Sequence, residues 1–215
     1  MRRLRYRIAF LALVIAISTA ATGPAAASAS EFKAGGYPAT LTGSQLASER
    51  LQIFFSEGSV VCETATLSGT LAGAANNVTL HPVFGTCSAF DFVNIPVATT
   101  GCDFKLHSGA LAGTGIWEGT LDVVCEAGKS ITLTAFGCEV SIGSVNGLSE
   151  LDLVDDREIP EDVTVRPLIG GIPYTVKKSG PVCALTTGSF TNGSMTGRYT
   201  VTATAGGKAT AFFVE

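Results

Sequence analysis

Charge is scarce in this chain: only 15% of its 215 residues are charged, and it has two histidines and one tryptophan. No C-x-x-C pair is present, and neither histidine belongs to an H-x-H or H-E-x-x-H motif, so no zinc-site spacing is found. A phosphate-binding glycine loop, a dinucleotide fingerprint and the G-x-S-x-G motif of serine hydrolases are also missing. We therefore predict no cofactor, and no motif assigns a catalytic or metal-ligating residue.

The first 29 residues have the pattern of a secretory signal peptide. Arginines at positions 2, 3, 5 and 7 precede an apolar run over residues 8–17, and an Ala-x-Ala pattern fits cleavage after Ala27 or Ala29. That run is too short to cross a bilayer core of about 30 Å as a helix, although an uncleaved membrane anchor is the alternative interpretation. We predict a leader over 1–29 and one exported all-β domain over 30–215, secreted and extracellular or associated with the cell surface.

The charge of the exported part points away from polyanionic partners. Removing the four leader arginines leaves 10 of the 14 basic residues against 18 acidic ones, a net charge near −8. Such a protein is expected to avoid nucleic acid and anionic membranes. Downstream of the leader no apolar run approaches the roughly 20 residues of a membrane helix, so we predict no membrane span after cleavage.

Apolar and polar residues alternate with a period of two along most of the chain, which is typical of strands with one buried face. The dipeptides Asn146-Gly147, Asn192-Gly193 and Gly206-Gly207 are turn signals, and residues 193–197 are interpreted as a hairpin turn. The only weak helix candidate is Ser44 to Arg50. Many short strands predict an all-β fold, an antiparallel β-sandwich with a barrel-like arrangement as the alternative. The predicted strands are 51–55, 59–67, 77–84, 90–97, 102–107, 120–125, 131–135, 138–143, 147–154, 162–168, 172–177, 196–204 and 208–214.

Six cysteines follow the leader, and an exported compartment favours their oxidation to structural disulfides over metal ligation or nucleophilic chemistry. The midpoint between Cys62 and Cys87 falls in a turn-like segment, as does the midpoint between Cys102 and Cys125. Each pair would face each other across antiparallel strands, within the reach of a disulfide. This leaves Cys138 to pair with Cys183, so two hairpins would be stapled and a third bridge would join distant segments.

Several residues are candidates for chemistry, but no motif supports them. Asp91, Asp103, Glu118 or Asp122 could supply the two acids of a glycoside hydrolase, although sequence places no two of them together. His81 and His107 could orient a serine or bind zinc, but exposed strand histidines are far more common.

A dense acidic segment spans residues 150–162, opposed only by Arg157. Calcium binding is one interpretation, and a solvated acidic loop between two strands explains the segment equally well. Trp117 is expected to pack in a half-buried position rather than to form a sugar-binding platform.

Five stretches of the exported part carry a resemblance to known proteins. They are Cys62-Glu63-Thr64-Ala65-Thr66, Ser68-Gly69-Thr70, Gly101-Cys102 with Phe104 and His107, 123–132 and Cys138-Glu139-Val140. With them the chain resembles a group of small exported, cysteine-containing β-rich proteins from high-GC Gram-positive (actinobacterial) soil bacteria. The resemblance extends over most of the exported part. It implies an exported β-protein and carries over no functional residue.

Two functional hypotheses follow. The first is a non-catalytic exported protein, stabilised by disulfides, which uses Thr-rich sheet faces and loops to bind a cell-envelope polymer or a protein, or serves as a structural module. The alternative is a small secreted hydrolase that uses carboxylates or His107.

Overall fold

The computed structural model describes residues 30–89, 93–135, 137–156, 162–178, 180, 183 and 185–215, and every regular element within them is a β-strand. The predicted leader and Asp91 lie outside this part of the chain. Among these residues there is no helix long and apolar enough to span a membrane. The strands are β1 (Phe32–Ala34), β2 (Ala39–Gln45), β3 (Leu51–Phe55), β4 (Gly58–Leu71), β5 (Asn77–Ala89), β6 (Val93–Ile95), β7 (Val97–Ala98), β8 (Cys102–His107), β9 (Leu111–Gly113), β10 (Ile116–Cys125), β11 (Ile131–Ala135), β12 (Cys138–Ile142), β13 (Val145–Asp156), β14 (Asp162–Lys178), β15 (Gly188–Thr196), β16 (Tyr199–Ala205), β17 (Lys208–Thr210) and β18 (Phe212–Val214).

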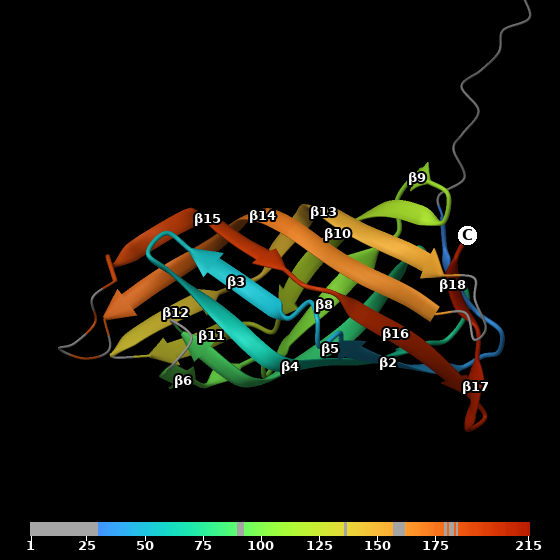
Figure 1. Ribbon diagram of the computed structural model, residues 1–215, viewed down its shortest axis with the longest axis horizontal. Helices are drawn as coiled ribbons and strands as arrows, with labels where there is room; N and C mark the ends of the chain where they lie inside the picture. The colour runs from blue at the N-terminus through green and yellow to red at the C-terminus, as the bar shows by residue number, and fades with distance from the viewer. Residues whose placement is uncertain are drawn as a thin grey trace, which may run out of the picture.

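Eight of these strands close into an antiparallel barrel. The ring runs β2, β4, β5, β8, β10, β13, β14 and β16, and β16 pairs again with β2. The molecule is elongated, with β2, β16 and β17 near one end and β12 and β15 toward the other (Figure 1). The all-β prediction is confirmed, and of the two predicted arrangements the structure has the barrel-like one. Closure removes most of the exposed strand edges that an open sheet leaves.

Two long strands connect the two ends of the barrel. One half of β4 pairs with β2 and the other half with β3, over its 14 residues. Likewise β14, with 17 residues, pairs with β16 at one end and with β15 at the other. Strand β3 also pairs with β15. Together β3 and β15 continue the sheet between β4 and β14 beyond the ends of β2 and β16.

The barrel interior is filled with side chains. Inward positions alternate with outward ones, as in β8, where Cys102, Phe104 and Leu106 are buried between partly exposed residues. Each fully buried Leu, Ile, Val or Phe contributes about 1.5–3 kcal/mol of transfer free energy. The cavity among the apolar core side chains measures only about 20 Å³, barely the size of one water molecule. In the described part of the chain, an interior packed in this way leaves the outer surface as the place for a ligand.

A two-stranded ribbon, β1 with β18, closes one end of the barrel. Phe32 and Phe212 are buried and stacked, with ring centroids 6.0 Å apart and an interplanar angle of 9°. The N–H of Glu31 donates to the carbonyl of Glu215, and the reverse bond also forms, at 2.8 and 3.0 Å. Both chain ends of the folded domain are therefore held together at one place.

The structure has three disulfides, in the pairing that the hairpin midpoints predict. Cys62 lies opposite Cys87 on β4 and β5, with a Cα–Cα distance of 3.9 Å. Cys102 lies opposite Cys125 on β8 and β10, at 4.0 Å. The third bridge joins Cys138 on β12 to Cys183 in the connection between β14 and β15.

Two local predictions are wrong. Most of the helix candidate 44–50 is a turn that follows β2, and the amide of Gln45 fixes this turn by bonding the carbonyl of Cys62 and the N–H of Leu51. The predicted turn at Asn192-Gly193 lies inside β15, as does most of the hairpin turn predicted over 193–197. A Cβ at position 193 would lie 2.8 Å from the carbonyl oxygen of Ile172, so this glycine permits close strand approach rather than a turn.

Other turns follow the sequence signals to different degrees. Gly206-Gly207 connects β16 to β17 with φ values of 57° and 76°, as predicted. The turn expected at Asn146-Gly147 lies earlier, between β12 and β13, so this pair already belongs to β13.

Candidate functional site

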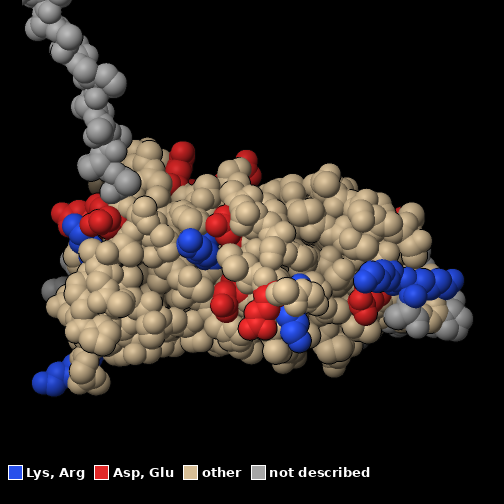
Figure 2. All heavy atoms as spheres, turned by 180° about the vertical axis from the view of Figure 1, so that it is seen from behind, with Lys and Arg blue, Asp and Glu red and all other residues tan. Residues whose placement is uncertain are grey.

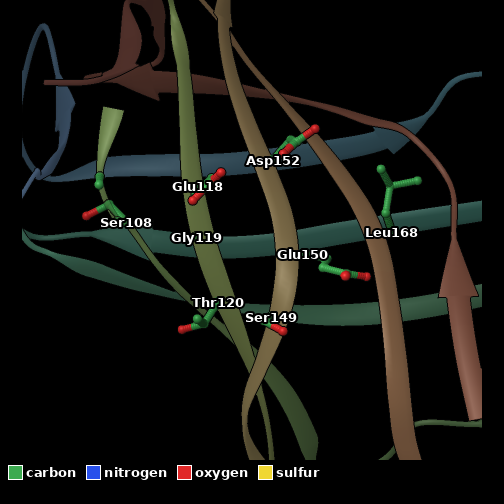
Figure 3. Close-up of a pocket in the computed structure, with 10 residues that line it drawn as sticks. Ser108, Glu118, Gly119, Thr120, Ser149, Glu150, Asp152 and Leu168 are labelled. Carbon is green, nitrogen blue, oxygen red and sulfur yellow. The ribbon is translucent and has the colours of Figure 1, made fainter. Parts of the chain in front are cut away.

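A hollow of about 730 Å³ lies on the outer face of the barrel across β10, β13 and β14 (Figure 3). This volume is in the range of small-ligand sites, roughly 300–1,000 Å³. Its lining combines hydroxyl groups, carboxylates and one exposed leucine. The lining residues are Ser108, Gly109, Ala110, Glu118, Gly119, Thr120, Ser149, Glu150, Asp152 and Leu168.

A β-bulge shapes the centre of the hollow. Gly119 pairs with Leu151 and Leu121 with Leu148, so β13 has one residue more than β10 between these two pairs. The bulge places Glu150 in the left-handed region, with a φ of 68°, and leaves both Ser149 and Glu150 exposed. Bulges of this kind redirect side chains and are frequent beside binding and active sites.

Three carboxylates line this hollow. Glu118 on β10 is directly opposite Asp152 on β13, and Glu150 lies two residues before Asp152 on β13. Among the described residues, Arg166 forms an ion pair with one of the three: its Nη1 lies 3.8 Å from Oδ2 of Asp152. Like charges directly opposite each other on neighbouring strands are unfavourable. A positively charged group in the hollow would relieve this repulsion.

A second hollow of about 460 Å³ adjoins the first and shares Leu168 with it. Leu168 is 51% exposed, which is high for a leucine on a sheet. The charges here are largely paired within the protein. Arg198 contacts Glu49 at 2.7 Å, and Arg50 forms an ion pair with Glu63. The first hollow, called the acidic hollow below, is therefore the one whose carboxylates are available to a positively charged ligand.

The two histidines each form a pair with an aspartate on a neighbouring strand. His81 on β5 contacts Asp103 on β8, with 2.9 Å between Nδ1 and Oδ1. His107 on β8 contacts Asp122 on β10, with 2.8 Å between Nε2 and Oδ2. A hydroxyl residue lies opposite each histidine: Ser68 pairs with His81 across β4 and β5, and position 120 is opposite His107.

Neither histidine lines the acidic hollow. His81 and Asp103 are nearly half exposed. No hydrogen bond between either histidine and its opposite hydroxyl is found among the described residues. Both histidines lie in strands with paired neighbours on both sides, where the sheet uses the backbone N–H groups that an oxyanion hole would need.

Asp122 links the second pair to the β13 strand. Burial alone would raise the pKa of its carboxyl, but the Gly147 N–H and His107, which bond to it, together with the charge of Lys105, lower this pKa below its ordinary value of 3.8. The Gly147 N–H donates to Oδ1 at 2.7 Å. This carboxylate is therefore held in its ionised form.

Replacing Asp122 with asparagine is expected to lower the free energy of unfolding at pH 7 by about 1 kcal/mol, the size of one hydrogen bond to a partly exposed charge. A lowered folded-state pKa stabilises the protein above the unfolded value of 3.8. That contribution is lost as the pH falls through the folded pKa. Urea unfolding from pH 7 to pH 3 should show the gap between wild type and Asp122→Asn closing; a constant gap would contradict the assignment.

The acids and the tryptophan singled out in the sequence lie in different places in the structure. Of the four candidate acids, Glu118 lines the hollow, whereas Asp103 and Asp122 bond to histidines and Asp91 lies outside the described residues. Glu150 and Asp152 were expected only as members of an acidic loop. Trp117 is 6% exposed and belongs to the core, more deeply buried than predicted.

The described part of the acidic segment is not a loop. Residues 150–156 continue β13 and residue 162 begins β14, so alternate side chains face opposite sides of the sheet. Asp155 is buried while Asp152 faces outward. Within the described residues no group of three or more His, Cys, Asp or Glu is arranged to hold a metal ion.

Charged side chains do not gather into one continuous patch on the face of the molecule seen from behind the view of Figure 1. Figure 2 shows them as scattered groups of both signs on a mostly uncharged surface.

Comparison with known proteins gives no match. No family model fits the chain, and neither a curated protein nor a solved structure is significantly similar to it.

Proposed function

We propose that this protein is an exported, non-catalytic binding module whose ligand occupies the acidic hollow on β10, β13 and β14. The observation that carries the proposal is a hollow of ligand size, lined by three carboxylates of which only Asp152 forms an ion pair with a described residue. The barrel that supports it is rigid, because two disulfides connect neighbouring strands of its wall and a third ties β12 to the connection between β14 and β15. Such bridges suit a stable extracellular protein.

The chemistry of the hollow favours a ligand with protonated amines. Glu118, Glu150 and Asp152 can each accept charge-assisted hydrogen bonds, which are the stronger ones. Ser149 and Thr120 add hydroxyl groups that donate or accept. An envelope polymer with free amino groups fits this lining better than a neutral or anionic polymer.

A chitosan oligosaccharide is a suitable probe, and its fully N-acetylated counterpart is the neutral control. By isothermal titration calorimetry we expect the amine-bearing oligomer to bind and the acetylated one not to bind. The double variant Glu118→Gln/Glu150→Gln should weaken binding about tenfold, equivalent to about 1.4 kcal/mol. Affinity should also fall with added salt, because exposed charges are screened.

Glu126→Gln is the matched control, since this glutamate is exposed and lies just past the end of β10, outside the hollow. It should bind like the wild type. Equal affinity of the double variant and the wild type would exclude the acidic hollow as the ligand site.

A second candidate is a small hydrolase. The arrangement of Ser68, His81 and Asp103 on three neighbouring strands favours it, as does the position of His107 beside residues that line the hollow. A screen with ester, peptide and glycoside substrates tests it, with His107→Ala, Asp103→Ala and Ser68→Ala as variants. Activity that all three variants retain would refute this assignment.

The resemblance to exported actinobacterial proteins stays a prediction, because no relative was found that tests it.

A further inference from the structure

The outer face of β16, β2 and β4 has a regular grid of hydroxyl groups. Every second residue is Thr or Ser in 200–204 of β16, 40–44 of β2 and 66–70 of β4. The strand register aligns these residues in three rows across the sheet. The central row, for example, joins Thr202, Thr42 and Ser68.

The grid faces solvent and has few internal partners. All of its residues are exposed except Thr200, which is partly exposed. One hydroxyl, that of Thr202, donates to the backbone carbonyl of Thr42 at 3.3 Å. No hydrogen bond joins two hydroxyls of the grid, which lies entirely within the described residues. The hydroxyl groups are therefore available to an external partner.

The spacing of the grid is fixed by the sheet. Neighbouring strands lie about 4.8 Å apart, and alternate residues along a strand lie about 6.7 Å apart. Each hydroxyl can both donate and accept a hydrogen bond, and no charged side chain lies between the rows. A partner that matches this face is uncharged and presents hydroxyl groups at short, regular intervals.

We propose that the hydroxyl grid binds a neutral polysaccharide chain that runs across β16, β2 and β4. Neighbouring strands of a twisted sheet are rotated by roughly 20–25° relative to each other. A flexible glycan chain can follow this curvature, whereas a flat crystalline surface such as ice cannot contact all three rows. This site is independent of the acidic hollow, because β2 is opposite β10 in the ring of eight strands.

The test is a pull-down of the folded domain, residues 30–215, on two insoluble but non-crystalline neutral polysaccharides, amorphous cellulose and a β-1,3-glucan, at about 0.1 M and about 1 M NaCl. We expect a bound fraction that does not change with salt, since no ions take part. Thr42→Val keeps the β-branched shape at the centre of the grid and removes the hydroxyl, and Thr42→Lys adds a charge. Both should reduce the affinity about fivefold or more.

Thr191→Val, an exposed threonine on β15 outside the grid, is the matched control and should bind like the wild type. Circular dichroism of each variant checks that the barrel is folded. No binding to either polysaccharide, or equal binding by the Thr42 variants, overturns the proposal. Binding that disappears at high salt would show that charged groups retain the protein, and would also overturn the proposal. Inhibition of ice recrystallisation without glycan binding would assign the grid to ice and overturn it too.

Discussion

Phe212→Ala is expected to lower the free energy of unfolding by about 3–5 kcal/mol, the typical cost of truncating a buried phenylalanine. Phe212 is 1% exposed and stacks on Phe32, so its removal leaves a cavity beneath the ribbon that closes the barrel end. Equilibrium unfolding in urea measures the loss. Hydrogen exchange at the amides of Glu31 and Glu215 should accelerate, because their mutual bonds depend on this ribbon.

Phe54→Ala is the matched control. Phe54 is 37% exposed on β3, and its truncation should cost about 1 kcal/mol or less. The double variant Phe32→Ala/Phe212→Ala should cost less than the sum of the two single variants, because the rings contact each other. Equal losses for Phe212→Ala and Phe54→Ala would show that the ribbon does not stabilise the barrel.

Removing the Cys138–Cys183 disulfide with a double alanine variant is expected to cost about 4 kcal/mol, because the bridge restricts a segment of 45 residues in the unfolded chain. The Cys62–Cys87 bridge encloses 25 residues and should contribute about 3.5 kcal/mol by the same estimate. Denaturant unfolding of each pair variant gives these values.

Reduction of the wild type with a thiol provides the control for the alanine substitutions. It should destabilise the protein by more than any single pair variant does. A pair variant as stable as the wild type would show that its bridge contributes nothing to stability.

The sequence predicts the disulfides and most of the strands, because both depend on local patterns. Alternation in 120–125 and 131–135 identifies strands in β10 and β11, and turn-like segments midway between cysteines predict two bridges directly. Closure into a barrel is different. Closure depends on β4 and β14, each of which pairs with different strands along its length. No local sequence pattern indicates such a change of partner.

The candidate site could be predicted only in part. Glu118 is a candidate from the sequence, but its position opposite Asp152 follows from strand register, and the position of Glu150 follows from a bulge. Neither is encoded in a motif. Four strands are also missed. Strands β1 and β9 have three residues each, too few to show alternation, whereas β2 and β15 are longer and are predicted partly as a helix candidate and as turns.

Because strands from the two ends of the domain pair with each other, the parts of the domain are expected to fold in a fixed order. Strands β4 and β5, and β8 and β10, are near neighbours in sequence, so their pairing and their disulfides can form early. The pairs β2–β16 and β1–β18 join opposite ends of the domain and require nearly the whole chain. During synthesis, the barrel therefore stays open until β16 is available to pair with β2.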